Sequence, residues 1–210
     1  MNITYLFDPL CGWCYGASGA LEQLSRVDGA TIQLSPTGLF AGEGARAMDQ
    51  SFADYAWQND QRIARLTGQV FSEAYRQQVL GAKGASFDSA PATLALVAVG
   101  LQAPTDEIAA LKALQLARYV DGRDNGDIGV VIGILADAGF TEAADRLRAP
   151  DQELMAAYRA RTASARADMA HFGANGVPSV VVGEANNRRL LRSGALFGDP
   201  AMLLAQLEAA

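Results

Sequence analysis

The pattern of hydrophobic and polar positions divides the chain into three parts. In the first part, residues 2–7 carry their larger hydrophobic side chains at every second position, which predicts a strand of a buried sheet. Residues 14–27 then show helical spacing, and residues 30–35 alternate again. We therefore expect the N-terminal part to form a strand, a helix and a second strand.

The middle part is expected to be helical. From about Met48 to Phe172, alanine-rich amphipathic runs are separated by Gly, Pro and Asp, and strand patterns are almost absent. The hydrophobic spacing predicts helices near residues 48–66, 69–81, 89–101, 105–121, 127–138 and 151–172.

Strand patterns return in the last part. A β-branched run at 177–182 and a shorter run at 188–192 predict a hairpin, followed by a helix at 199–208. The order β-α-β, helices, β-β-α lets both chain ends build one sheet of an α/β fold. We expect residues 1–45 and 174–210 to form one domain and residues 46–173 an inserted helical subdomain.

Composition and charge exclude several classes of protein. The 210 residues are 50% hydrophobic and 19% charged, which is typical of a globular protein with a substantial core. The net charge is -6 and the 17 Lys and Arg are scattered, so no nucleic-acid partner is expected. No apolar stretch approaches the roughly 18 residues that a membrane span requires, so no membrane partner is expected either.

Candidate chemistry lies in the two cysteines, Cys11 and Cys14. The N-terminus shows no features of a secretory leader, so we expect a cytoplasmic protein. A reducing compartment disfavours a purely structural disulfide, which favours reactive use of the pair.

The spacing assigns a role to each cysteine. Disulfide exchange requires a thiolate, and Cys11 is expected at a helix start, where free amides and the helix dipole stabilise negative charge. Cys14 would lie nearly one turn further in, where it can resolve a mixed disulfide on Cys11. Trp13 between them could contact an apolar partner or simply pack. Asp8 could relay a proton for Cys14, although a turn role before Pro9 is the simpler interpretation.

A metal site is the main alternative use of a Cys-x-x-Cys pair. A tetrahedral zinc site needs four ligands, yet the chain has no third cysteine and its only histidine, His171, lies far along the sequence. We therefore expect no metal.

Two motifs together resemble the DsbA family of thioredoxin-like proteins, and its cytosolic FrnE-like branch in particular. They are residues 5–14, ending in Cys11-Gly12-Trp13-Cys14, and Gly176-Val177-Pro178-Ser179. The resemblance implies a thioredoxin-like fold of DsbA type with a large helical insertion between the β-α-β and β-β-α halves. It also implies a redox-active Cys11–Cys14 disulfide, with a cis Pro178 facing the cysteines and Val177 pairing with bound substrate.

The function implied is thiol–disulfide exchange, as oxidoreductase or isomerase, with protein or small thiol and disulfide partners. Because neither residue between the cysteines is His, we expect a less oxidising pair than Cys-Pro-His-Cys. The alternative is a glutathione-dependent transferase or isomerase of the kappa or hydroxychromene-carboxylate isomerase type. No cofactor is expected apart from glutathione as a thiol partner, and the sequence predicts no particular oligomeric state.

Overall fold

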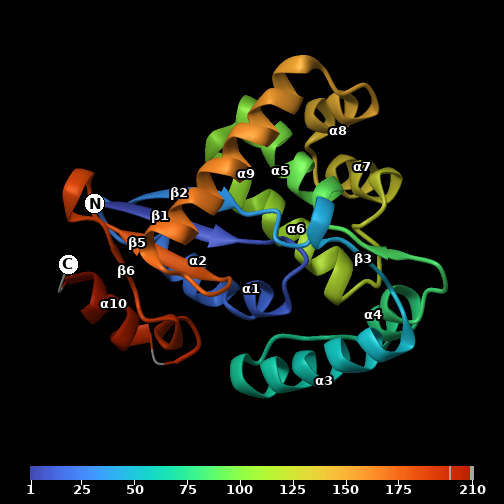
Figure 1. Ribbon diagram of the computed structural model, residues 1–210, viewed down its shortest axis with the longest axis horizontal. Coiled ribbons are helices and arrows are strands. Elements are labelled where there is room, and N and C mark those ends of the chain that lie inside the picture. The colour runs from blue at the N-terminus through green and yellow to red at the C-terminus, as the bar shows by residue number, and fades with distance from the viewer. Residues whose placement is uncertain (199, 209–210) are drawn as a thin grey trace.

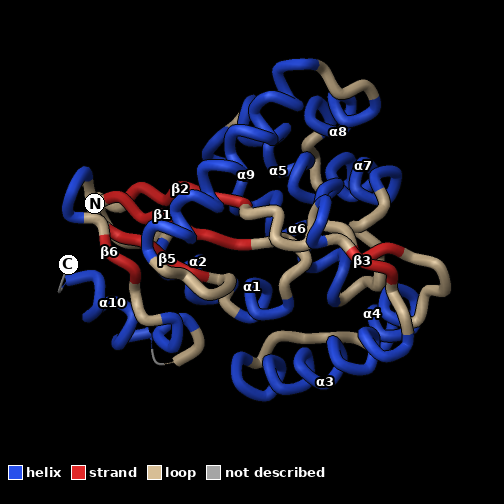
Figure 2. The backbone as a smooth tube through the Cα atoms, viewed as in Figure 1, coloured by secondary structure: helices blue, strands red, loops and turns tan. Residues whose placement is uncertain are grey.

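The computed structural model describes residues 1–198 and 200–208, and its centre is a four-stranded sheet (Figures 1 and 2). In spatial order the strands are β2 (Thr31–Pro36), β1 (Asn2–Phe7), β5 (Ser179–Val182) and β6 (Arg189–Leu190). β1 pairs with β2 in parallel and with β5 antiparallel, and β6 is antiparallel to β5. Both ends of the chain thus contribute to one sheet, as the sequence predicts.

Helices cover both faces of the sheet (Figure 1). The face of β1 that carries Ile3, Tyr5 and Phe7 belongs to the main hydrophobic core, which includes side chains of α2 and α10. On the opposite face, Leu6 and Val181 pack with residues of α9. The covering helices are α1 (Gly12–Gly16), α2 (Ser18–Leu24), α9 (Gln152–Phe172) and α10 (Pro200–Glu208).

Several predicted boundaries differ from the structure. The single helix predicted over 14–27 begins at Gly12 and is broken at Ala17 into α1 and α2. Strand β5 begins only after Pro178, and β6 is limited to two residues. The predicted first residue of the last helix, Asp199, lies outside the described residues.

The middle of the chain is helical, with two differences from prediction. Instead of one helix over 69–81, a single turn capped by Ser72 leads into a π-helix over Arg76–Leu80. The helix over 141–148 was not predicted, because it is short and has few hydrophobic positions.

The helices of the middle part are α3 (Gln50–Thr67), α4 (Glu73–Tyr75), α5 (Ala90–Gln102), α6 (Glu107–Tyr119), α7 (Ile128–Asp137) and α8 (Thr141–Arg148). Two short strands, β3 (Arg46–Ala47) and β4 (Ser86–Phe87), pair beside them.

The helices and the sheet share one hydrophobic core. A single cluster of buried side chains extends from β1 and β5 through α5, whose residues from Ala95 to Val99 are all buried. Helix α9 packs on α5 and also on β2, so it contacts both the helical part and the sheet. Within the described residues, no helix is long and apolar enough to cross a membrane. The division into domains at residues 45 and 173 stays a prediction.

One ion pair joins three helices to the sheet. Arg161 of α9 donates to both carboxylate oxygens of Glu107 on α6, at 2.9 and 2.6 Å, and to the Leu34 carbonyl of β2 at 2.7 Å. The pair lies against Gly100 of α5, where a Cβ would overlap with the Glu107 carboxylate. Glycine is disfavoured inside a helix, and here its lack of a side chain makes room for the pair.

We predict that Arg161→Ala lowers the free energy of unfolding by about 2–3 kcal/mol, because it leaves the Glu107 carboxylate, 10% exposed, without its cation. Arg148→Ala is the matched control: its pair with Asp145 is 55% and 73% exposed, and its loss should cost less than about 1 kcal/mol. Urea denaturation of both variants measures the difference. Equal losses would contradict the importance given to the Arg161 pair.

Candidate functional site

The Cys-x-x-Cys turn begins directly after β1. The Cys11 amide donates to the Asp8 carbonyl at 3.1 Å, and Cys11 then stands as the residue before the first turn of α1 with an extended backbone. Both cysteines are free thiols, with Cys11 7% and Cys14 1% exposed. The structure therefore places Cys11 at a helix start, as predicted, with Cys14 behind it in the core.

The second motif meets this turn from the far end of the chain. The Val177–Pro178 peptide bond is cis, and the Cys11 thiol donates to the Val177 carbonyl at 3.5 Å. The Ser179 hydroxyl closes the same turn by donating to the Gly176 carbonyl at 2.8 Å. Residues separated by 166 positions in the sequence thus form one site.

The surroundings of Cys14 favour its thiol form. Burial raises the pKa of Cys14 well above its usual range, and a hydrogen bond toward Cys11 and the charge there raise it further. Tyr5 lies beneath the turn and donates to the Cys14 carbonyl at 3.4 Å. Cys14 therefore keeps its proton at neutral pH.

Asp8 holds the connections around the turn together. Its buried carboxylate accepts from the Leu10 amide at 2.9 Å, the Phe40 amide at 3.1 Å and the Ser89 hydroxyl at 2.7 Å. Burial raises the pKa of Asp8, and these three donors partly oppose the shift. The carboxyl group thus has the turn role suggested by its place before Pro9, and it also fastens the turn to the start of α5.

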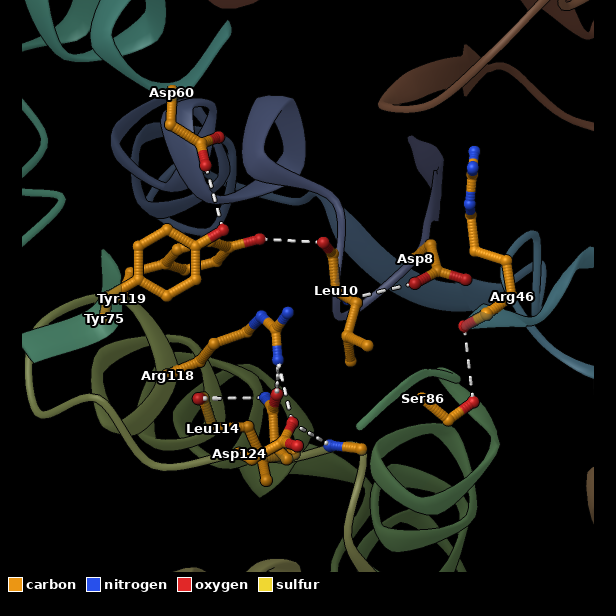
Figure 3. A network of polar contacts seen from close by, with 12 residues as sticks. Asp8, Leu10, Arg46, Asp60, Tyr75, Ser86, Leu114, Arg118, Tyr119 and Asp124 are labelled. Atoms are coloured by element: carbon orange, nitrogen blue, oxygen red, sulfur yellow. Dashed lines mark hydrogen bonds and ion pairs between the residues drawn. The ribbon is translucent and has the colours of Figure 1, made fainter. Parts of the chain in front are cut away.

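A carboxyl group from α3 lies over the turn, and the sequence analysis did not select it. Asp60 is 5% exposed and lies so close to Gly12 that a Cβ there would overlap with its Oδ1. Tyr75 donates to Asp60 Oδ2 at 2.9 Å, and Tyr119 beside it donates to the Leu10 carbonyl at 2.8 Å (Figure 3). Burial raises the pKa of Asp60 to about 7, although Tyr75 and Arg118 oppose the shift.

A buried arginine supports these tyrosines. Arg118 is 1% exposed and donates to Asp124 at 3.2 Å (Figure 3). It also donates to Asn125 at 3.1 Å. Its guanidinium group lies 5.6 Å from the ring centre of Tyr75 and 5.9 Å from that of Tyr119. A positive charge is thus kept in the core by one carboxylate, one amide and aromatic faces.

Two cavities open on either side of Trp13. The first, here called the proline cavity, has a volume of about 720 Å³ and is lined by Trp13, Asn175, Val177, Pro178, Ser193 and Phe197 among others. The second, the aromatic cavity, has about 230 Å³ and is lined by Cys11, Phe40, Phe52, Asp60, Tyr75 and Phe87 among others. The Trp13 ring packs edge-on against Phe197 at 5.1 Å, and Arg62 lies 5.8 Å from its centre. Trp13 therefore packs against Phe197 and also lines both cavities, and Cys11 lines the aromatic one.

The sequence contained a signal for Asp60. In α3 the buried positions Ala53, Asp60 and Ile63 lie on one face of an amphipathic helix, so a charged residue interrupts a hydrophobic stripe. A charge in such a position needs a structural or chemical reason. Among the described residues, no group of three or more His, Cys, Asp or Glu side chains is placed to hold a metal ion.

Comparisons with known proteins identify the family and the fold. Residues 2–207 match the DSBA-like thioredoxin domain. The cytosolic disulfide reductase DsbM from Pseudomonas aeruginosa is 33% identical with a TM-score of 0.86, covering 100% of this chain and 98% of that one. Its structure with GSH is 32% identical with a TM-score of 0.84 and the same coverage.

A more distant structure shows the fold alone. A 2-hydroxychromene-2-carboxylate isomerase is 16% identical with a TM-score of 0.61, covering 100% of this chain and 95% of that one. No curated protein sequence matches the chain. Because the domain match extends over nearly all residues, including both cysteines and the cis-proline turn, the chain belongs to the family of DSBA-like thioredoxin domains and has their fold.

Proposed function

We propose that the protein is a thiol–disulfide oxidoreductase that works through Cys11 and Cys14. The observation that carries the proposal is the meeting of three parts: Cys11 at a helix start, buried Cys14 behind it, and the Val177 carbonyl 3.5 Å from the Cys11 sulfur. Membership of the DSBA-like family supports the same chemistry.

The proposed exchange proceeds in two steps. The Cys11 thiolate attacks one sulfur of the partner disulfide, whose S–S bond breaks and releases one thiolate. Cys14 then loses its proton and attacks the Cys11 sulfur, which releases the second partner thiol and leaves a Cys11–Cys14 disulfide. Since burial raises the pKa of Cys14, it keeps its proton until the mixed disulfide has formed.

The residues around the cysteines have binding roles in this proposal. Val177 and Pro178 line the proline cavity beside Cys11, where the backbone can pair with an extended partner. Trp13 lines the same cavity and offers an apolar ring to the partner. The Val177–Pro178 turn thus aligns the partner so that one sulfur of the partner's disulfide reaches Cys11.

Reduction is the direction we propose, with glutathione as the thiol partner and no other cofactor. No His separates the two cysteines, so the thiolate receives less stabilisation and the disulfide is correspondingly less oxidising. Two glutathione molecules would return the Cys11–Cys14 disulfide to the dithiol and leave as glutathione disulfide. The similarity to a cytosolic disulfide reductase, also solved with GSH, supports both this donor and a cytoplasmic setting.

Substitution of each cysteine tests the proposed roles. Cys11→Ser should reduce turnover in an insulin-reduction assay to the uncatalysed rate, because the attacking sulfur is gone. Cys14→Ala should instead accumulate mixed disulfides on Cys11, which mass spectrometry detects as adducts lost on reduction. Full insulin turnover by Cys11→Ser would overturn the proposal, and absence of adducts on Cys14→Ala would refute the resolving role.

Glutathione kinetics separate the dithiol mechanism from the transferase or isomerase alternative. We predict that Cys14→Ala loses at least about tenfold in glutathione-dependent disulfide turnover, a barrier change of about 1.4 kcal/mol. Wild-type protein treated in parallel provides the reference. A glutathione transferase should keep its conjugating activity without Cys14, so saturable conjugation by Cys14→Ala would favour the alternative.

A further inference from the structure

The aromatic cavity is a second approach to Cys11 that the proposed function does not use. Cys11 lines this cavity, whereas the Val177–Pro178 turn lies in the proline cavity on the other side of Trp13. With about 230 Å³ it is smaller than the roughly 300–1,000 Å³ typical of cavities for drug-sized ligands. It therefore fits a small thiol or disulfide better than a loop of a folded protein.

Asp60 gives the cavity a chemical preference. It is 5% exposed, one oxygen accepts from Tyr75, and none of the ion pairs within 4.0 Å among the described residues includes it. Arg118 acts on it from a greater distance and is paired with Asp124. A buried carboxylate beside aromatic rings is a good acceptor for a cation, because the ring faces and the carboxylate both attract positive charge.

The position of Asp60 relative to Cys11 limits the length of the ligand. Asp60 Oδ1 lies against Gly12, the neighbour of Cys11, and consecutive Cα atoms are about 3.8 Å apart. A ligand cation at Asp60 and a ligand sulfur at Cys11 would thus lie beside neighbouring residues of the same turn. An aminoethyl thiol, in which two carbons join nitrogen to sulfur, has a length of this order.

We propose that the aromatic cavity binds the ammonium group of small aminothiol disulfides through Asp60 and presents their sulfur to Cys11. The inference rests on the proposed function and names a substrate class for it. The Cys11 thiolate attacks the nearer sulfur, the S–S bond breaks, and one aminothiol leaves as its thiolate. Cys14 then releases its proton and displaces the second aminothiol, so two electrons pass from the dithiol to the substrate; glutathione restores them.

A pair of matched substrates tests the cation preference. Cystamine carries an ammonium at each end, and bis(2-hydroxyethyl) disulfide has a neutral hydroxyl in the same place. The measurement is the rate at which excess disulfide oxidises the reduced protein in a single turnover, followed by mass spectrometry and divided by the rate with free dithiothreitol. We expect this normalised rate to favour cystamine by about tenfold at about pH 8.5.

The preference should depend on pH. The groups that face Asp60 are Tyr75 from α4, Arg118 and Tyr119 from α6, and Cys11 at the start of α1. Burial raises the pKa of Asp60 to about 7 and places it below those of the two tyrosines, which burial also raises. The preference should therefore fall toward one at about pH 5.5, where Asp60 is protonated. Ionisation of Cys11 affects the rates with both substrates equally, so its effect cancels in the ratio of the two rates.

Variants complete the test. Asp60→Asn should lower the normalised preference to about one, whereas Asp54→Asn, an exposed position of the same helix, should retain it. A preference that survives in Asp60→Asn, or a wild-type ratio of one at both pH values, overturns the inference. If the proposed function itself were wrong, neither disulfide would oxidise the wild-type protein faster than dithiothreitol. The pH series uses wild-type protein, so it stays informative even if Asp60→Asn fails to fold.

Discussion

The antiparallel pairing of β1 with β5 is the constraint on which the site depends. Leu6 pairs with Ser179, so the end of β1 lies beside the start of β5. The turn after β1 carries Cys11, and the turn before β5 carries Val177 and Pro178. Because strands of opposite direction bring an end and a start together, the contact between Cys11 and Val177 follows from the pairing. Any shift in this register would separate the cysteine from the proline turn.

The polar groups above the turn depend on the same packed framework. Asp8, Asp60 and Arg118 are buried, and burial of a charge is costly unless hydrogen bonds or opposite charges compensate it. Each has such partners from another segment: Ser89 for Asp8, Tyr75 for Asp60, and Asp124 for Arg118. These contacts fasten the helical part to the Cys-x-x-Cys turn, so the helices help to position the two cysteines.

The sequence predicted local features and the two motifs better than it predicted contacts. Period-two alternation identified β1 and β2, and the Cys11–Cys14 spacing indicated redox chemistry when it was combined with the predicted helix start and the Val177-Pro178 motif. The break at Ala17 and the π-helix at 76–80 escaped prediction, because both are compatible with a continuous helical pattern.

Asp60 shows why the rest of the site could not be predicted from the sequence. Its spacing in α3 marks it as buried, but only the fold reveals that it faces Gly12 from 48 positions away in the sequence. The sequence also does not reveal why position 12 requires glycine, because a glycine between the two cysteines indicates only an unhindered turn. In the structure it is the absence of a side chain that admits the carboxyl group. Long-range contacts of this kind depend on the packing of whole helices, which periodicity does not encode.

The two cavities give the single reactive sulfur two different neighbourhoods. The proposed reductase would exchange with an oxidised substrate and then with a reducing thiol, and both proposed reactions pass through Cys11. One side of Trp13 offers backbone groups of the proline turn, suited to an extended peptide-like partner, and the other offers aromatic faces and a carboxyl group. Because Cys11 lines the aromatic cavity and its sulfur lies 3.5 Å from the Val177 carbonyl of the proline turn, partners of different chemistry can reach the same atom without sharing a binding surface. Selectivity for each partner can then change by substitution on one side of Trp13 while the Cys11–Cys14 pair stays unchanged.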